Sequence, residues 1–281
     1  MKRVAAAALL VGTAYSFTLQ RAPLRRASPR YASPLAEGSS GSIDSLFSAT
    51  SPVRIEGNSL KTWDLGDEAT ERVQLSIRSC GGRPLFADVE LWHTPSYIPT
   101  RFSVSCEDGH AQPFHTIIET PKHPKTVAVF NTGQDDDGNA AVHEFPIEAS
   151  LEPSRLGKAF ETAFADEVPA MVQGGQVMSY IFAPDVDSIQ VLLKTDDLGK
   201  RNMKAMIELT QGPDDTNTIV ELYASDGYKN PFYAVLQTPG GATLRIINQN
   251  DVEFPFDAFV LPYEMASQEK AAEIEMGSSW A

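Results

Sequence analysis

The feature that most constrains the fold of this chain is an internal duplication, because a repeat fixes the architecture as a set of related units. Residues 108–121 lie 118 residues before residues 226–239, and six of the 14 aligned positions are identical. The same offset aligns residues 87–91 with residues 205–209. Two further pairs match at slightly shorter offsets: 126–131 with 243–248, and 144–149 with 253–258. The first copy therefore carries an extra acidic loop, which we expect at the surface.

Each copy consists of short segments separated by Gly, Pro, Asn and Asp, which is typical of β-strands. In the first copy the expected strands are 73–77, 87–92, 102–105, 114–119, 126–131 and 145–151. Val73, Leu75 and Ile77 alternate with polar residues, so one face of that strand should pack on a core. The repeated Asp-Gly pairs predict hairpin-type turns in which Gly adopts positive φ. Six or seven strands in about 95 residues favour a β-sandwich over an α/β fold.

The predicted fold is therefore all-β: two tandem homologous β-sandwich or jelly-roll-like units related by pseudo-two-fold symmetry, each followed by a helix. The first helix is expected at 154–165, where Leu156, Phe160 and Phe164 form an apolar stripe, and the second at 264–276. The second helix is mostly polar. Its end, with Met276 and Trp280, is either frayed or an assembly interface that docks on another molecule.

The predicted organisation places two targeting segments before the repeats. Residues 1–16, with Lys2 and Arg3 before an apolar run, resemble a signal peptide, and residues 17–36 are basic and free of acidic residues, like a transit peptide. The order of the predicted parts is signal peptide 1–16, transit peptide 17–36, flexible linker 37–51, β repeat 1 at 52–151, helical connector 152–168, β repeat 2 at 169–263, and C-terminal helix or tail 264–281. The leader resembles the bipartite leaders of proteins imported into secondary plastids of algae. A secreted protein with a basic propeptide is the alternative.

Composition excludes several partners and frameworks. The net charge is −14, and it becomes −20 if residues 1–36 are removed, which is the wrong sign for binding nucleic acid. Two cysteines, Cys80 and Cys106, are too few for a disulfide framework, and we expect free thiols. No apolar run approaches the roughly 20 residues of a transmembrane helix, so no transmembrane segment is predicted.

Motifs for catalysis, cofactor binding or metal binding are not found in the sequence: it has no Gly-x-Ser-x-Gly, Walker, dinucleotide-binding, HExxH or CxxC pattern. All five histidines fall in the first copy: His93, His110, His115, His123 and His143. Tyr228 and Tyr233 stand where His110 and His115 would repeat, an exchange that suits packing and would abolish metal ligation. Residues 135–139 lack the glycine and glutamate spacing of a calcium loop. We therefore predict no catalytic residue, no cofactor and no metal.

The plastid-type leader, together with the duplicated Asp-Gly-x-x-x-Pro-Phe and Glu-Phe-Pro segments, resembles the pyrenoid shell (PyShell) proteins of diatoms and related algae. The resemblance covers residues 53–263. It implies a non-enzymatic protein of the plastid stroma that self-assembles into a sheet-like lattice around the Rubisco matrix of the pyrenoid. The implied partners are other copies of the chain, paralogous shell proteins and Rubisco. The alternatives are a carbohydrate- or lipid-binding β-sandwich, with Trp92, Tyr97 or Tyr228 as a binding platform, and a cryptic hydrolase.

Overall fold

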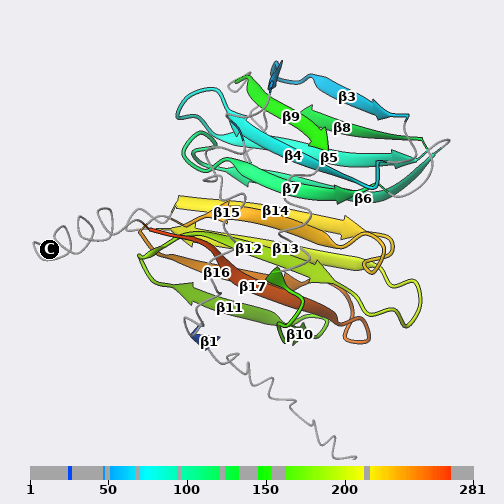
Figure 1. Cartoon of the computed structure of the whole chain (residues 1–281), viewed down its shortest axis with the longest axis vertical. Helices are drawn as coiled ribbons and strands as arrows, with labels where there is room; N and C mark the ends of the chain where they lie inside the picture. Colours follow the sequence, from blue (N-terminus) through cyan, green and yellow to red (C-terminus); the bar gives the residue numbers. More distant parts are fainter. Residues whose placement is uncertain are drawn as a thin grey trace, which may run out of the picture.

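The computed structural model describes residues 25–26, 47, 51–66, 70–93, 96–120, 124–132, 145–153, 163–211, 216–238 and 240–266, which form two long stacked sheets (Figure 1). In spatial order, sheet A contains β1 (Arg25–Arg26), β11 (Val177–Phe182), β16 (Ala242–Asn248), β13 (Met203–Gln211), β14 (Thr216–Ala224), β6 (Tyr97–Cys106), β5 (Leu85–His93), β8 (Lys125–Asn131) and β3 (Leu60–Leu65). Sheet B contains β10 (Ala170–Val172), β17 (Phe256–Met265), β12 (Val186–Lys194), β15 (Phe232–Gln237), β7 (Phe114–Glu119), β4 (Arg72–Ser79), β9 (Ile147–Pro153) and β2 (Val53–Ile55).

Each repeat is an eight-stranded jelly roll with four strands in each sheet. Repeat 1 contributes β3, β8, β5 and β6 to sheet A and β2, β9, β4 and β7 to sheet B. Repeat 2 contributes β11, β16, β13 and β14 to sheet A and β10, β17, β12 and β15 to sheet B, in the matching order. This order of two interleaved four-stranded sheets is that of a jelly roll. The prediction of two homologous all-β units is confirmed, with two strands per unit, at 53–65 and 170–182, that were not predicted individually.

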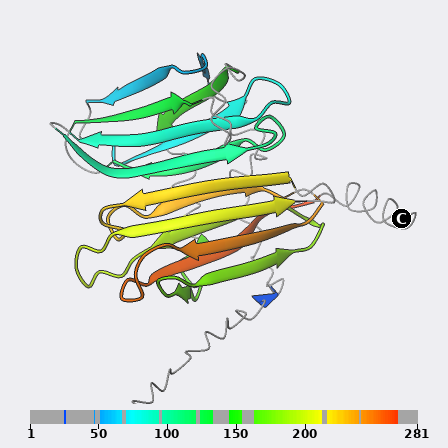
Figure 2. The same ribbon diagram turned by 180° about the vertical axis from the view of Figure 1, so that it is seen from behind.

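The two repeats are fused edge to edge about a pseudo-two-fold axis. In sheet A, β6 pairs antiparallel with β14, and Ser103 faces Glu221, its equivalent at the 118-residue offset. In sheet B, β7 pairs antiparallel with β15, and Thr116 faces its own equivalent, Ala234. The axis therefore passes through both pairs, and each sheet runs uninterrupted through the molecule (Figures 1 and 2).

One continuous hydrophobic core fills the space between the sheets and crosses the junction. Phe102 of β6 is 5% exposed, and its ring centroid lies 5.8 Å from Phe114 and 5.7 Å from Phe232. Phe114 and Phe232 are the repeated Phe of the two Pro-Phe motifs. The motif therefore places two equivalent rings on either side of the axis, where they join the two halves of the core.

A repeated asparagine explains a second part of the duplicated sequence. The amide nitrogen of Asn131 donates to the carbonyl oxygens of Ile55, at 3.2 Å, and Phe145, at 2.8 Å. The equivalent Asn248 donates to a carbonyl of β10 and to that of Phe254, each at 2.9 Å. Both asparagines are buried. Each asparagine lies in sheet A and holds an edge strand of sheet B, together with the Phe-Pro segment, against sheet A. Both amides are thereby hydrogen-bonded, as buried polar groups generally are.

The repeated Asp-Gly pairs do not form the predicted hairpins. They connect β6 to β7 and β14 to β15, which lie in different sheets, and neither Gly109 nor Gly227 has a positive φ. Their glycines are required by close packing instead. A Cβ on Gly109 would lie 2.4 Å from the Cβ of Leu85, and one on Gly227 would lie 2.8 Å from Cγ2 of Thr195.

The outer faces of the two sheets differ. Strands of sheet A alternate, as in β5, where Asp88 is exposed between two buried residues. In sheet B, β4 and β12 are buried on both faces, so Gln74 and Ser76, predicted to face solvent, are 4% and 1% exposed. A small apolar cluster lies on the outer face of sheet B, over repeat 2 and the junction: Ile117, Phe164, Leu192, Tyr233, Val235 and Phe259.

The helices predicted after each repeat are not seen. Of the first, residues 163–165 are described: Ala163 is assigned as helix, and a turn begins at Phe164. The ring centroid of Phe164 lies 5.6 Å from that of Phe259 and 6.3 Å from that of Tyr233. The second was predicted to begin at Glu264, but Glu264 and Met265 are the last residues of β17, where pairing with β12 extends the sheet. The remainder of both segments lies outside the described residues.

Candidate assembly surfaces

The two ends of the molecule are built from equivalent edge strands with different chemistry. Alignment through the strand pairings puts Tyr180 of β11 at the place of Trp63 in β3, an offset of 117 residues. At this offset three apolar residues of repeat 2 replace three charged residues of repeat 1: Met171 for Arg54, Met178 for Lys61, and Ile181 for Asp64. The sequence alone did not show that β3 and β11 correspond, because an aromatic residue at one shared position, Trp63 and Tyr180, is a weak signal.

The end formed by repeat 2 exposes apolar side chains. Met171 of β10 is 58% exposed and Ile181 of β11 is 45% exposed. Val168 precedes β10 and is 89% exposed, and Val252 and Phe254 are exposed in the loop between β16 and β17. A cluster of exposed apolar residues at one end of a molecule is typical of a protein interaction site.

The end formed by repeat 1 also exposes two apolar residues, Val53 and Leu60, but it carries charges beside them. Arg54 donates to Glu56 at 2.7 Å across an exposed surface. The Lys61 ammonium lies 5.6 Å from the centroid of the Trp63 ring, and Asp64 accepts a hydrogen bond from Thr126 at 2.7 Å. Charged residues of this kind on an edge strand oppose pairing with another strand.

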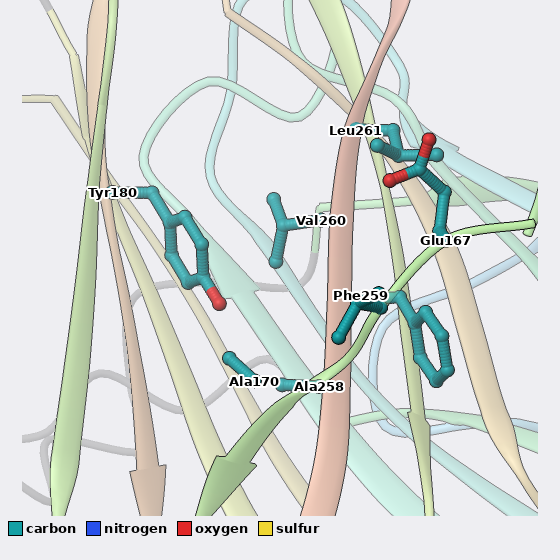
Figure 3. A pocket seen from close by; sticks show the side chains of 8 residues that line it. Glu167, Ala170, Tyr180, Ala258, Phe259, Val260 and Leu261 are labelled. Carbon is teal, nitrogen blue, oxygen red and sulfur yellow. The ribbon is translucent and has the colours of Figure 1, made fainter. Parts of the chain in front are cut away.

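A small cavity lies beside the apolar end, between the segment 167–170, β11 and β17 (Figure 3). Its volume is about 80 Å³, and Glu167, Tyr180 and Val260 are among the residues that line it. Pockets for small ligands are typically ~300–1,000 Å³. The cavity is therefore too small for a sugar or a lipid, and it offers one carboxylate and one phenol as its polar side chains.

The predicted assembly residues Met276 and Trp280 lie outside the described residues. The described chain leaves sheet B after β17, where the backbone amide of Ala266 donates to the carbonyl of Asp185 at 2.8 Å. Met265, the last residue of β17, is 52% exposed.

The described histidines occupy unlike environments. His110 is exposed, the ring of His93 packs edge-on to Tyr97 at 5.6 Å, and His115 is fully buried. His123, His143 and the acidic loop at 135–139 lie outside the described residues. Within the part of the chain that is described, no three His, Cys, Asp or Glu residues group as metal ligands would.

His115 sits in a polar pocket on the outer face of sheet B in repeat 1. Its Nδ1 lies 2.8 Å from the Ser76 hydroxyl, and its Nε2 has no hydrogen-bond partner among the described residues. The Phe47 ring covers it edge-on at 6.2 Å, and the Arg78 guanidinium stacks 4.3 Å over that ring. Burial lowers the pKa of His115 to about 3, because desolvation penalises the imidazolium.

Both cysteines are free thiols. Cys106 is 3% exposed in the core near the junction, and burial raises its pKa to about 11. Its sulfur lies 2.9 Å from the Gln112 side-chain oxygen, which also accepts a hydrogen bond from Thr218 of repeat 2 at 2.9 Å. Cys106 thus takes part in a polar contact between the repeats and is held in its protonated, unreactive form.

The acidic character of the chain shows on the outer face of sheet A, at the pseudo-two-fold axis. Asp88, Ser103 and Glu221 lie in one row across β5, β6 and β14. Burial, with a smaller contribution from Glu90 and Glu221, raises the pKa of Asp88. The centre of this face is therefore anionic.

Comparison with family models gives a match to the diatom pyrenoid shell proteins over residues 47–262. The chain belongs to this family. The match begins at Phe47, which covers His115, and spans both jelly rolls and the junction between them. The resemblance inferred from the duplicated motifs is thereby confirmed. Family membership associates the chain with the pyrenoid of the plastid.

Comparison with solved structures gives weak similarities for this pyrenoid shell family member. One is from the atomic structure of Sulfolobus Turreted Icosahedral Virus, with 11% identity over 72% of this chain and 94% of that chain, and a TM-score of 0.19. Another is vicilin from hazelnut, Corylus avellana, with 10% identity over 74% of this chain and 75% of that chain, and a TM-score of 0.16. Both TM-scores are too low to support conclusions. The comparison with curated proteins gave no match.

Among the described residues, none forms a helix of the length and hydrophobicity that crossing a membrane requires.

Proposed function

We propose that this chain is a non-catalytic structural protein that self-assembles into a sheet-like lattice enclosing the Rubisco matrix of the pyrenoid. The lattice would support CO2 fixation and limit the leakage of CO2. The observation that carries the proposal is the family match, which spans both repeats. The proposed partners are other copies of the chain, together with paralogous shell proteins and Rubisco, at the periphery of the pyrenoid in the plastid stroma. The predicted leader, 1–36, would direct the chain there.

The architecture is suited to this role. Two fused jelly rolls form an elongated double-layered slab whose sheets run without a break from one end to the other (Figure 2). The two ends are related in backbone but unequal in side chains, with Met171 and Ile181 at one end and Arg54 and Asp64 at the other. A protomer with unequal surfaces can make contacts that propagate, and propagating contacts give sheets or tubes.

The test is electron microscopy of the purified chain. Ordered sheets or tubes support the proposal, whereas monodisperse monomers over a range of concentrations and salt would contradict it. Alanine substitution of Met276 and Trp280 tests whether the C-terminal residues take part, because loss of an apolar anchor weakens an interface. A matched control is Leu198→Ala, since Leu198 is a 78% exposed apolar residue in a loop.

Ionic strength should control this assembly. The chain has a net charge of −14, so copies repel one another at low salt and screening favours their association. We expect light scattering at a fixed protein concentration to rise as salt is raised from about 0.01 M, where the Debye length is about 30 Å, to about 0.15 M, where it is about 8 Å. Scattering that is the same at both salt concentrations would show that charge repulsion does not limit assembly.

A further inference from the structure

Strands β3 and β11 are the equivalent outermost strands of the two repeats in sheet A, and the short strand β1 pairs with β11 on its outer side. The two differ in charge, since the β3 edge carries charged residues that oppose pairing. Along β3, Lys61 points inward in the same row as Trp63 and Leu65, which pack against the core. An inward-pointing charge is a device that prevents a further strand from adding to a sheet, because the added strand would bury it. Asp64 lies on the outward face of β3, near the end of the strand, and adds a second charge.

The β11 edge lacks both features. Met178 takes the place of Lys61 and packs against the core, while Ile181 takes the place of Asp64 and is 45% exposed. The six residues of β11 carry no charge. An uncharged, apolar strand at the side of a sheet is a template for pairing with another chain.

The structure also shows that this edge accepts a strand. Arg25 and Arg26 of β1 pair in parallel with Tyr180 and Ile181. Among the described residues this pairing covers two residues of β11, and it comes from the segment predicted to be a transit peptide, so removal of that segment would uncover these two residues.

We propose that the β11 edge joins two copies of this chain, by antiparallel pairing of β11 with β11 of a second copy. The inference rests on the proposed function and names one of its contacts. The model for the contact is the junction inside the molecule, where equivalent strands of the two repeats already pair antiparallel about a pseudo-two-fold axis in both sheets. The second copy displaces β1 and extends sheet A through four jelly rolls.

The charge on β3 determines which edges pair. Pairing β11 with β3 of a neighbour would bury Lys61 against an apolar strand, and pairing two β3 strands would bury two such lysines. Pairing two β11 strands brings the uncharged side chains of Met178 and Ile181 against those of the second copy. This symmetric contact closes a pair of copies and does not propagate, so the lattice also needs contacts at other surfaces.

Cross-linking between cysteines tests the proposal in the full chain. Ser179 lies on the outward row near the middle of β11, and Thr62 is its equivalent on β3, which makes Ser179→Cys and Thr62→Cys a matched pair. In a symmetric antiparallel pair the two residues at position 179 would have Cβ atoms roughly 4.5–8 Å apart, within reach of a short bis-maleimide. The unsubstituted chain measures the background from the half-buried Cys80.

We expect about ten-fold more cross-linked dimer from Ser179→Cys than from Thr62→Cys, since a difference of only ~1.4 kcal/mol between the edges has that effect. Adding Ile181→Asp to Ser179→Cys should return the yield to background, whereas adding Leu198→Asp, an exposed loop residue, should not. Equal yields from the two cysteine variants would overturn the proposal. So would cross-links that form only when differently tagged Ser179→Cys and Thr62→Cys chains are mixed, because these would show pairing of β11 with β3.

Electron microscopy of the same samples separates this inference from the proposed function. Sheets or tubes without a cross-link at position 179 would refute β11 pairing and leave the lattice standing. Cross-linked pairs that never grow further would support β11 pairing and refute the lattice.

Discussion

Replacing His115 by Asn should remove a defined part of the pH dependence of stability. The unfolded histidine has a pKa of about 6.5, whereas burial lowers the pKa in the folded protein to about 3. Below pH 6.5 the unfolded chain binds a proton that the folded chain excludes, so stability is fully present above pH 6.5 and is lost as the pH falls toward 3. The loss is ~1.4 kcal/mol per pH unit, which amounts to about 2 kcal/mol at pH 5.

Asn is the suitable replacement because its amide can occupy the place of Nδ1 and keep the hydrogen bond to Ser76, which is 2.8 Å long in the native protein. The titrating group is then removed with little change to its polar contact. Burial raises the pKa values of Asp88 and Asp257, so that at these carboxyls the folded state holds a proton more readily than the unfolded state. Their effect has the opposite sign and is present in both proteins, so it cancels in the comparison.

The measurement is urea unfolding followed by tryptophan fluorescence at pH 7 and pH 5, at one ionic strength and at a concentration below that of assembly. Between these pH values the native protein should lose about 2 kcal/mol more than His115→Asn. His110→Asn, which changes an exposed histidine, should behave like the native protein. If the native protein and His115→Asn lost the same stability within about 0.5 kcal/mol, the buried neutral histidine would not be the cause, because that difference is a small part of the value expected from linkage.

Substitutions at three further places test the fold. Phe102→Ala should cost about 3–5 kcal/mol and lower the single unfolding transition of both repeats together, as measured by calorimetry, because its ring fills the core at the junction; two separate transitions would show that the repeats are independent. Asn131→Ala and Asn248→Ala should each cost roughly 2–3 kcal/mol in urea unfolding, since each leaves two backbone carbonyls without a donor, and the exposed Asn217→Ala should cost less than about 0.5 kcal/mol. Gly109→Ala should destabilise by about 1–3 kcal/mol through the 2.4 Å approach to Leu85, whereas Gly82→Ala, with its nearest atom at 3.5 Å, should be tolerated; equal midpoints for the two would exclude close packing as the reason for Gly109.

The sequence predicts the strands well where the duplication supplies two readings of each one. The expected strands at 114–119 and 126–131 match β7 and β8 to within one residue. The offsets of 118 and 117 residues between copies agree with the strand pairs, since Val89 pairs with Val129 in repeat 1 and Ile207 pairs with Ile246 in repeat 2. The pseudo-two-fold axis follows from the same offset, since Thr116 faces Ala234. Repetition is informative because the two copies, with different sequences, must fold to the same backbone structure.

The sequence is less informative where two physical causes produce the same pattern. A repeated Gly can mean a positive φ or a close approach, and the structure assigns Gly109 to the second. Gln74 and Ser76 alternate with apolar residues and are nevertheless buried, because the outer face of sheet B is covered. The helix predicted from Glu264 begins as strand, since pairing with β12 outweighs the helical propensity of its glutamate and methionine.

The positions at which the two copies diverge are informative about function, because the duplication provides an internal reference for each of them. The Phe of the two Pro-Phe motifs and the asparagine anchors match between copies, as expected where both must satisfy the same packing. The fold sets no such requirement at the outer edges. There Met178 and Ile181 of repeat 2 stand at the positions of Lys61 and Asp64 in repeat 1. A chain that remained a monomer would be safest with two charged edges, since an apolar edge invites unwanted pairing. The protein carries protective charges on one edge and has apolar residues at the same positions of the other, which is the arrangement required if one specific edge is meant to pair.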